Sequence, residues 1–196
     1  MLCSLRAEVL VVRLLVYALV RLGAASTVFA ASFGASTADV RYPTCHVHKS
    51  TDVHFRNAES KDVLEVSIGT GSCYAATLAI VIRSEFGAVL YGYVAPFKRH
   101  VVTNWADRGL DADATRFVED VIATGMRTTS ELPPYQDPTD FYDETNNVIQ
   151  ISKLEYEKLR SKRRPMLFHL THYESWQYVV FDEATGKAVV VITGGL

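Results

Sequence analysis

The sequence predicts an α+β fold in which one main helix packs on an antiparallel β-sheet. Two stretches lead to this class: residues 176–196 contain two apolar runs around a polar turn, and residues 113–124 contain one amphipathic helical pattern. The apolar runs before and after the helix also have strand character. Strands and a helix that follow one another in blocks are typical of α+β domains.

The terminal hairpin is the strongest strand signal. Its arms are rich in Val, Tyr, Phe and Ile, and Asp182–Lys187 separates them, with Gly186 near the end of the turn. β-branched and aromatic side chains fit a half-buried pleated surface, and glycine supplies the backbone freedom of a turn. Ala188–Ile192 is apolar at every position. We therefore expect it to be buried on both faces at the centre of a sheet.

The main helix is expected over Asp113–Thr124. Asp111 and Asp113 stand at its start, where carboxylates cap free N–H groups and favour the positive end of the dipole. Gly125 stands where a C-terminal cap belongs. The apolar residues recur with helical spacing and form one stripe: Ala114, Phe117, Val118, Val121 and Ile122.

The region before the helix reads as mainly β. Arg41–His48 predicts an edge strand, Lys49–Lys61 a polar loop, and Val63–Ile68 a second strand. Two further apolar runs, Ala75–Ile82 and Ala88–Val94, predict another hairpin. A short buried helix over the first of these two runs is the alternative, because a continuous apolar run fits either structure.

After the helix, Thr128–Asn147 predicts a long loop with three prolines, the kind of segment that often carries function. Ile151–Arg164 predicts a short helix that ends in basic residues and stops at Pro165. Met166–Thr171 predicts a strand that leads into the terminal hairpin.

Residues 1–30 predict a secretory signal peptide, with cleavage near residue 25 or 30. Arg6 gives a positive start, Val9–Val20 is mostly apolar, and small residues follow. Arg13 interrupts the run, which is too short for a transmembrane helix of about 20 apolar residues. We divide the rest into a β-rich segment, 31–105, and an α+β region, 106–196. The formal net charge of −2 excludes a uniformly basic nucleic-acid coat protein.

The cysteines fit an oxidising compartment. Cys3 leaves with the leader, so the mature chain keeps Cys45 and Cys73. An even count predicts one disulfide that closes a loop of about thirty residues and stabilises the fold by about 3 kcal/mol. Two buried free thiols are the alternative.

Three short motifs support a family resemblance over residues 106–196. Tyr178–Thr193 is similar to a strand–turn–strand segment that ends in V-I-T-H. Phe141–Asn147 is similar to a loop rich in tyrosine and asparagine, and Leu167–Leu170 is similar to a strand that carries a catalytic Glu. Together they resemble the small secreted guanyl-specific ribonucleases of fungi and the ribonuclease-like effectors derived from that fold. The resemblance implies a microbial ribonuclease-like sheet and descent from proteins that bind RNA.

The resemblance does not carry the family's catalytic groups. At the positions where the family has its catalytic loop His, Glu, Arg and C-terminal His, this sequence has other residues: Asp143, His169, Tyr178 and Gly194, respectively. Cleavage of RNA in that family needs a base, an acid and a cation on the phosphate. We therefore expect a pseudoenzyme without a cofactor. An active enzyme would have to use His169 with Asp143.

A basic segment and one aromatic side chain are the candidates for nucleic-acid contacts: Lys158, Arg160, Lys162, Arg163, Arg164 and Tyr142. A solvated basic helix end is the alternative. His169 and His172 are three apart on a strand and point to opposite faces, which favours core or surface histidines over a catalytic pair. No metal site is expected, because Cys45 and its neighbouring histidines match no structural-zinc spacing.

These observations favour a secreted, monomeric, non-catalytic fungal virulence effector that binds a host protein or RNA, outside the cell or after translocation into a host cell. No DNA partner and no membrane contact after leader removal are expected. Two alternatives stay open: an active secreted ribonuclease, and a disulfide-stapled extracellular β-domain that binds protein only.

Overall fold

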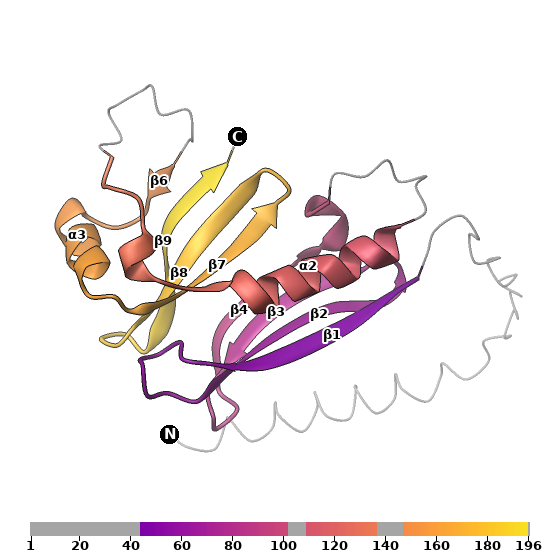
Figure 1. Cartoon of the computed structure of the whole chain (residues 1–196), viewed down its shortest axis with the longest axis horizontal. Coiled ribbons are helices and arrows are strands. Elements are labelled where there is room, and N and C mark those ends of the chain that lie inside the picture. The colour runs from indigo at the N-terminus through magenta and orange to yellow at the C-terminus, as the bar shows by residue number, and fades with distance from the viewer. Residues whose placement is uncertain (1–43, 102–108, 137–146, 196) are drawn as a thin grey trace, which may run out of the picture. The chain divides into compact units, whose positions relative to one another are not determined.

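The computed structural model of the chain describes residues 44–101, 109–136 and 147–195 (Figure 1). They belong to one compact unit, Asp39–Leu196. Within them lie two α-helices and two antiparallel sheets, so the predicted α+β class is confirmed. The predicted signal peptide and the predicted boundary between residues 105 and 106 lie outside the described residues. No helix among the described ranges is long and apolar enough to cross a membrane.

The first sheet, sheet A, has four antiparallel strands in the order β1-β2-β3-β4. Its strands are β1 (Thr44–Val53), β2 (Asp62–Ser72), β3 (Thr77–Arg83) and β4 (Val89–Pro96). Alternate apolar residues of the two central strands are fully buried on one face: Leu64, Val66, Ile68, Leu78, Ile80 and Ile82. This alternation is the pattern of a sheet with one face packed on a core.

The predicted edge strand and second hairpin are confirmed, and the short-helix alternative for the hairpin is wrong. The polar loop predicted over 49–61 is wrong in its first part, because β1 continues to Val53. As an edge strand, β1 carries polar side chains outward while its backbone pairs with β2, Lys49 opposite Val66 and Ser50 opposite Glu65. Lys49 also forms an ion pair with Glu119 at 2.6 Å.

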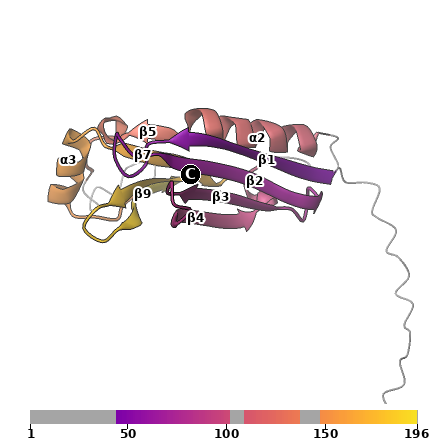
Figure 2. The ribbon, with the colours of Figure 1, turned by 90° about the horizontal axis from the view of Figure 1, so that it is seen from below.

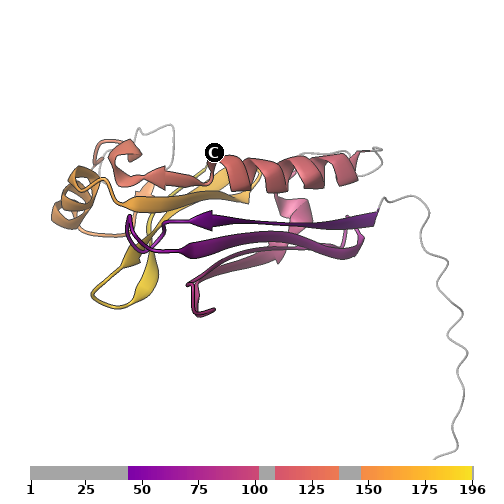
Figure 3. The same ribbon diagram turned by 60° about the horizontal axis from the view of Figure 1, so that its bottom comes forward.

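The main helix, α2 (Leu110–Thr124), runs along sheet A beside β1 (Figure 2, Figure 3). The predicted stripe faces the core, with Ile122 partly buried at its edge. The N-cap is Gly109 without a side-chain hydrogen bond, whereas Asp111 and Asp113 lie in the first turn. The two carboxylates therefore favour the positive end of the helix dipole rather than cap the helix.

Gly125 is the C-cap of α2, as predicted, but for a different reason. Its φ of −68° is ordinary helical geometry, so no left-handed conformation requires glycine. A Cβ at this position would meet the Val121 carbonyl and lie 3.3 Å from the Phe168 carbonyl. The Gly125 carbonyl also accepts a hydrogen bond from the Phe168 N–H at 2.7 Å. Close approach to the next sheet selects glycine here.

The second sheet, sheet B, has five antiparallel strands in the order β5-β7-β8-β9-β6. They are β5 (Met126–Thr128), β6 (Val148–Ile149), β7 (Pro165–His172), β8 (Ser175–Asp182) and β9 (Lys187–Gly195). The short helix α3 (Lys153–Ser161) lies beside it, and the 3₁₀ turns η1 (Phe97–Arg99) and η2 (Thr129–Glu131) complete the elements.

The terminal hairpin is confirmed as β8 and β9, with Gly186 in the left-handed region at φ 67°. Val191 and Ile192 are buried, but Ala188–Val190 is only half-buried. The expectation of a fully buried central strand is therefore wrong for that half. β6 pairs with Ile192 and Thr193, and the Gln150 N–H donates to the Val191 carbonyl at 3.0 Å, so within the described residues this pairing does not reach Ala188–Val190.

The disulfide between Cys45 and Cys73 is present, as predicted, so the alternative of two free thiols is wrong. Both cysteines are buried in the core, and they join β1 to the turn after β2 across 28 positions of sequence. The helix predicted within 151–164 is also confirmed. Ser152 caps α3 by accepting a hydrogen bond from the Glu155 N–H.

Candidate binding surface on the second sheet

The two faces of sheet B have different surroundings. Neighbouring residues on a strand point to opposite faces, and the register pairs Phe168 with Tyr178 and His169 with Gln177. We call the face toward sheet A the closed face, formed by Leu167, His169, Gln177 and Val179. We call the opposite face the open face, formed by Phe168, Trp176, Tyr178 and Gly194.

The closed face contains a buried polar network centred on His169. Its Nδ1 lies 2.8 Å from the Leu170 carbonyl, which can only accept, so Nδ1 carries the ring proton. Nε2 then accepts from the Tyr91 hydroxyl at 2.6 Å and from the Gln177 amide at 2.9 Å. The Gln177 amide also donates to Tyr91 Oη at 2.6 Å. Both ring nitrogens are satisfied.

Burial controls the protonation of this network. It lowers the pKa of His169 from 6.5 to about 4, because the charged imidazolium would lose its hydration. Burial also raises the pKa of Tyr91. Both groups are therefore neutral at pH 7, and the network is uncharged.

The weak catalytic candidates are not brought together within the described residues. His169 is 1% exposed and faces Tyr91 and Tyr93 of sheet A, away from solvent. Asp143, its proposed partner, and Tyr142, the proposed stacking residue, lie outside the described residues. His169 and Tyr178, carried over from the resemblance, point to opposite faces of sheet B. The buried imidazole has a structural role, in line with the preference for a core or surface histidine over a catalytic pair.

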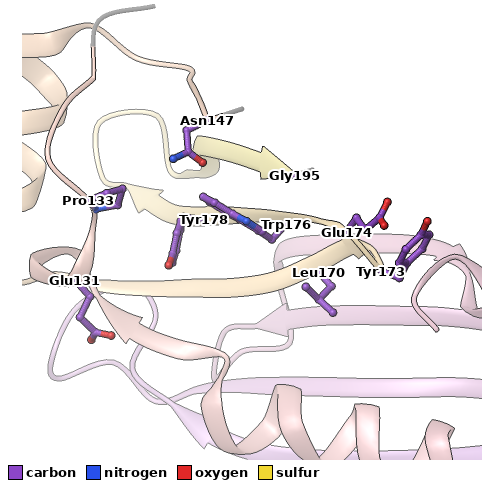
Figure 4. Close-up of a pocket in the computed structure, with 9 residues that line it drawn as sticks. All are labelled: Glu131, Pro133, Asn147, Leu170, Tyr173, Glu174, Trp176, Tyr178 and Gly195. Carbon is purple, nitrogen blue, oxygen red and sulfur yellow. The ribbon is translucent and has the colours of Figure 1, made fainter. Parts of the chain in front are cut away.

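The open face contains a trough of about 540 Å³ (Figure 4). Its lining combines three aromatic rings, two carboxylates, one amide and small or apolar groups: Glu131, Pro133, Asn147, Leu170, Tyr173, Glu174, Trp176, Tyr178 and Gly195. Figure 4 shows Trp176 near the middle, with Pro133 and Glu131 toward one end and Tyr173 and Glu174 toward the other. η2, its following residues, the turn after β7, and strands β8 and β9 supply most of the walls.

A packed aromatic cluster supports the trough. The ring centroids of Trp176 and Tyr178 lie 5.1 Å apart, and Phe168 is 5.1 Å from Tyr178 and 6.1 Å from Trp176. The Arg127 guanidinium lies 4.1 Å from the centroid of the Phe168 ring and donates to Tyr178 Oη at 3.2 Å. Stacking and the cation–π contact fix these rings, so the trough is largely preformed.

Gly194 makes room for the Trp176 indole. A Cβ at position 194 would lie 2.5 Å from Cε2 of Trp176 and 2.6 Å from Oδ1 of Asn147, distances that real side chains do not adopt. The indole ring of Trp176 thus fills the space that the side chain of the family's C-terminal catalytic His would need at position 194. Tyr178, at the position of the family's Arg, contributes a neutral phenol to the same surface.

The Trp176 indole N–H donates no hydrogen bond to any residue in the described ranges. Tyr173, at one end of the trough, is 40% exposed. Aromatic residues with an available polar group are enriched at protein interfaces, because one side chain then offers apolar area and a hydrogen bond together. Trp176 is therefore the residue of the trough best suited to contact a ligand through a hydrogen bond, and Tyr173 adds exposed aromatic area.

The charge of the trough is negative. Glu131 and Glu174 line it, and none of the described residues that line it is basic. Oε1 of Glu131 accepts from the Thr128 N–H at 2.9 Å, which fixes this carboxylate near one end. A hydrogen bond and the charge of Glu174 raise the pKa of Tyr173 at the other end. Arg127 is engaged with Phe168 and Tyr178 and does not line the trough.

The predicted basic segment lies elsewhere and is partly used by the fold. Arg160 donates to the Leu132 carbonyl at 3.0 Å, and Arg164 donates to the Phe181 carbonyl at 2.8 Å. Lys158, Lys162 and Arg163 are exposed, and none of the three forms an ion pair with the described residues. A shallow pocket of about 350 Å³ has a lining that includes three residues of this segment: Lys162, Arg163 and Arg164.

Sequence reasoning missed the trough and its central residue. Trp176 and Tyr178 alternate along β8, which is the available signal for a shared face. Three or more side chains able to hold a metal ion do not come together anywhere in the described residues. No protein-family model, curated protein or solved structure matches this chain.

Proposed function

We propose that this chain is a secreted, non-catalytic protein that binds a polypeptide partner through the open face of sheet B. The observation that carries this proposal is the preformed aromatic trough, in which Trp176 presents an indole N–H that no described residue accepts. A concave, mainly apolar site with a few directed polar groups is the usual form of a binding pocket.

Two further features support the non-catalytic part. The indole of Trp176 takes the space that a side chain at position 194 would need, and His169 is buried in a complete hydrogen-bond network. Secretion is supported by the Cys45–Cys73 disulfide together with the predicted leader. A ribonuclease-like origin and a role as a fungal effector acting on a host remain part of the proposal, on the motif resemblance alone.

A polypeptide is favoured over RNA because of the charge of the trough. RNA binding draws much of its affinity from basic side chains that neutralise phosphates. The trough instead presents the carboxylates of Glu131 and Glu174, with no cation among its described lining residues. Such a surface repels a phosphate backbone and accepts a partner with basic groups.

The test is a selection of peptide binders from a displayed random library on the full chain. Peptides that bind the wild type are then measured against Trp176→Ala and against Phe86→Ala. Phe86 is 85% exposed in the turn between β3 and β4, so it is a matched aromatic truncation outside the trough. We expect Trp176→Ala to weaken binding at least ten-fold and Phe86→Ala to leave it unchanged. Binders insensitive to Trp176→Ala would contradict the proposal.

RNA is tested in parallel with a labelled single-stranded oligonucleotide and with total RNA. Tight, salt-dependent binding that is lost when Lys158, Lys162 and Arg163 are changed to Ser, but is insensitive to Trp176→Ala, would favour RNA over a polypeptide. Robust, metal-independent cleavage of total RNA would overturn the non-catalytic part.

A further inference from the structure

We infer that the partner segment that occupies the trough is an extended, proline-containing peptide with a basic residue beside its prolines. This inference rests on the proposed function and specifies its partner. It follows from three properties of the trough: its place on the face of sheet B, its size, and the chemistry of its two ends.

The place of the trough excludes recognition by strand addition. A peptide that adds to a sheet needs a free edge with unpaired N–H and C=O groups. The trough lies on the face of β7, β8 and β9, where the strand backbones already pair with one another. Trp176 of β8, for example, pairs with Leu170 of β7 and with Gly194 of β9. The partner must therefore be recognised through side chains and through groups that project from them.

The size of the trough disfavours a helical partner. An α-helix with its side chains is about 10 to 12 Å across, and two turns of it fill roughly 850 Å³. The trough has a volume of about 540 Å³, so it holds only part of such a helix. An extended chain is narrower and fits the volume.

The lining favours a polyproline II conformation among extended chains. Such a helix has no internal hydrogen bonds, so its carbonyls are free to accept, and it binds to grooves lined by aromatic rings. Tyr173 and Trp176 supply accessible rings, Tyr178, which is 8% exposed, completes the aromatic lining, and Pro133 adds an apolar wall. The Trp176 indole N–H is the donor that a ligand carbonyl would engage. A preformed helix of this kind also loses little conformational entropy on binding.

The carboxylates set the charge of the partner. Glu131 and Glu174 lie toward opposite ends of the trough (Figure 4). A Lys or Arg beside the prolines places its cation near one of these carboxylates, while its aliphatic stem extends the apolar contact. An acidic residue at the same place would be repelled.

The experiment uses a synthetic probe in which proline residues and one leucine are flanked by an arginine at each end. Two control peptides replace the prolines by alanine or the arginines by glutamate. Binding is followed by the indole N–H signals of the ¹⁵N-labelled full chain, and Trp176→Phe assigns the signal because it removes the indole N–H while keeping a smaller aromatic ring at this position.

We expect the arginine–proline peptide to shift the Trp176 indole signal in a saturable manner. Each control peptide should bind at least ten-fold more weakly, and Trp176→Phe should weaken the probe about five-fold. Glu174→Gln and Glu131→Gln should reduce the preference for arginine over glutamate several-fold. The matched change Glu59→Gln, an exposed carboxylate in the turn between β1 and β2, should not affect it.

Equal binding of the alanine peptide, or no shift of the Trp176 signal by the arginine–proline peptide, would overturn this inference. Its failure is separable from that of the proposed function. Library binders that depend on Trp176 but contain neither proline nor a basic residue would leave the binding surface standing and exclude this partner. The absence of any Trp176-dependent binder would remove the proposed function itself.

Discussion

The two faces of sheet B carry side chains from the same strands, yet they differ in how completely their polar groups are satisfied. On the closed face, His169 and Gln177 form hydrogen bonds with Tyr91, which is 78 positions away from His169 in sequence. On the open face, Phe168 and Trp176 immediately precede these residues, and the indole N–H of Trp176 has no acceptor among the described residues. His169, although histidine is the residue type most often associated with catalysis, thus has a structural role. The neighbouring Trp176, in contrast, can donate a hydrogen bond to a ligand.

This difference arises because a second sheet covers only one face. Sheet A and α2 bury the closed face, and the polar groups there must find partners within the protein, since an unpaired buried group is costly. The open face is covered in part by α3 and η2, whose contacts leave the trough accessible. Changes on the closed face should therefore affect stability, and changes on the open face should affect binding.

The largest expected effect is from Leu167→Ala on the closed face. Leu167 is fully buried in the core between the sheets, so its truncation should leave a cavity and lower the free energy of unfolding by about 3 to 4 kcal/mol. Urea unfolding measures this change. The affinity of the folded variant for a library-selected peptide should stay within two-fold of the wild type; a parallel loss of affinity would mean that the two faces are not independent.

The pH dependence of stability should report on His169. Its pKa is lowered from 6.5 to about 4, so the unfolded chain binds the proton more readily than the folded chain does. The stability from the neutral histidine is fully present above pH 6.5 and is lost as the pH falls toward 4, by up to about 3 kcal/mol.

Urea unfolding between pH 7 and pH 4 measures this loss in the wild type and in His169→Gln. The variant cannot take up the proton, so its stability should fall less over this range, although burial also lowers the pKa of His100, which remains. Parallel pH profiles for the two proteins would contradict a buried neutral His169.

Trp176→Ala should separate binding from stability on the open face. We expect the affinity for a selected peptide to fall about 30-fold, the size of effect usual for a central interface tryptophan, which is about 2 kcal/mol. The free energy of unfolding should fall by about 1 kcal/mol, since the ring packs on Phe168 and Tyr178 but stays partly exposed. Calorimetric titration and urea unfolding measure the two quantities. A larger loss of stability than of affinity would assign Trp176 to the core.

The smallest effect is expected from neutralising Lys158, Lys162 and Arg163 together. They are exposed and pair with no carboxylate in the described ranges, so stability should change by less than about 0.5 kcal/mol. Peptide affinity should also be unchanged, because none of them lines the trough. A marked loss of peptide affinity would place the partner on the basic segment rather than on the open face.

Local patterns made much of the fold predictable. The stripe on α2 follows from helical spacing, the β8–β9 hairpin from a turn between apolar runs, and the disulfide from an even cysteine count. The extension of β1 through Lys49 was not predictable from polarity, because a solvent-facing edge strand and a loop have the same composition.

The binding surface was less predictable because it depends on distant pairing. The contact between Gly194 and the Trp176 ring follows from the register of β8 and β9. The hydrogen bond that His169 accepts at Nε2 comes from Tyr91, which lies on the other sheet. Neither relation appears as a spacing along the chain. Alternation could show that Trp176 and Tyr178 share a face, but not which face sheet A would cover.

The most direct test of the account is a map of backbone and indole chemical-shift changes when a library-selected peptide is added to the full chain. The account predicts that the changes concentrate at the trough, over Glu131–Pro133, Tyr173–Tyr178 and Gly195, with the Trp176 indole N–H among the largest. Changes concentrated instead on Lys158–Arg164 or on the outer face of sheet A, with the trough unaffected, would contradict it.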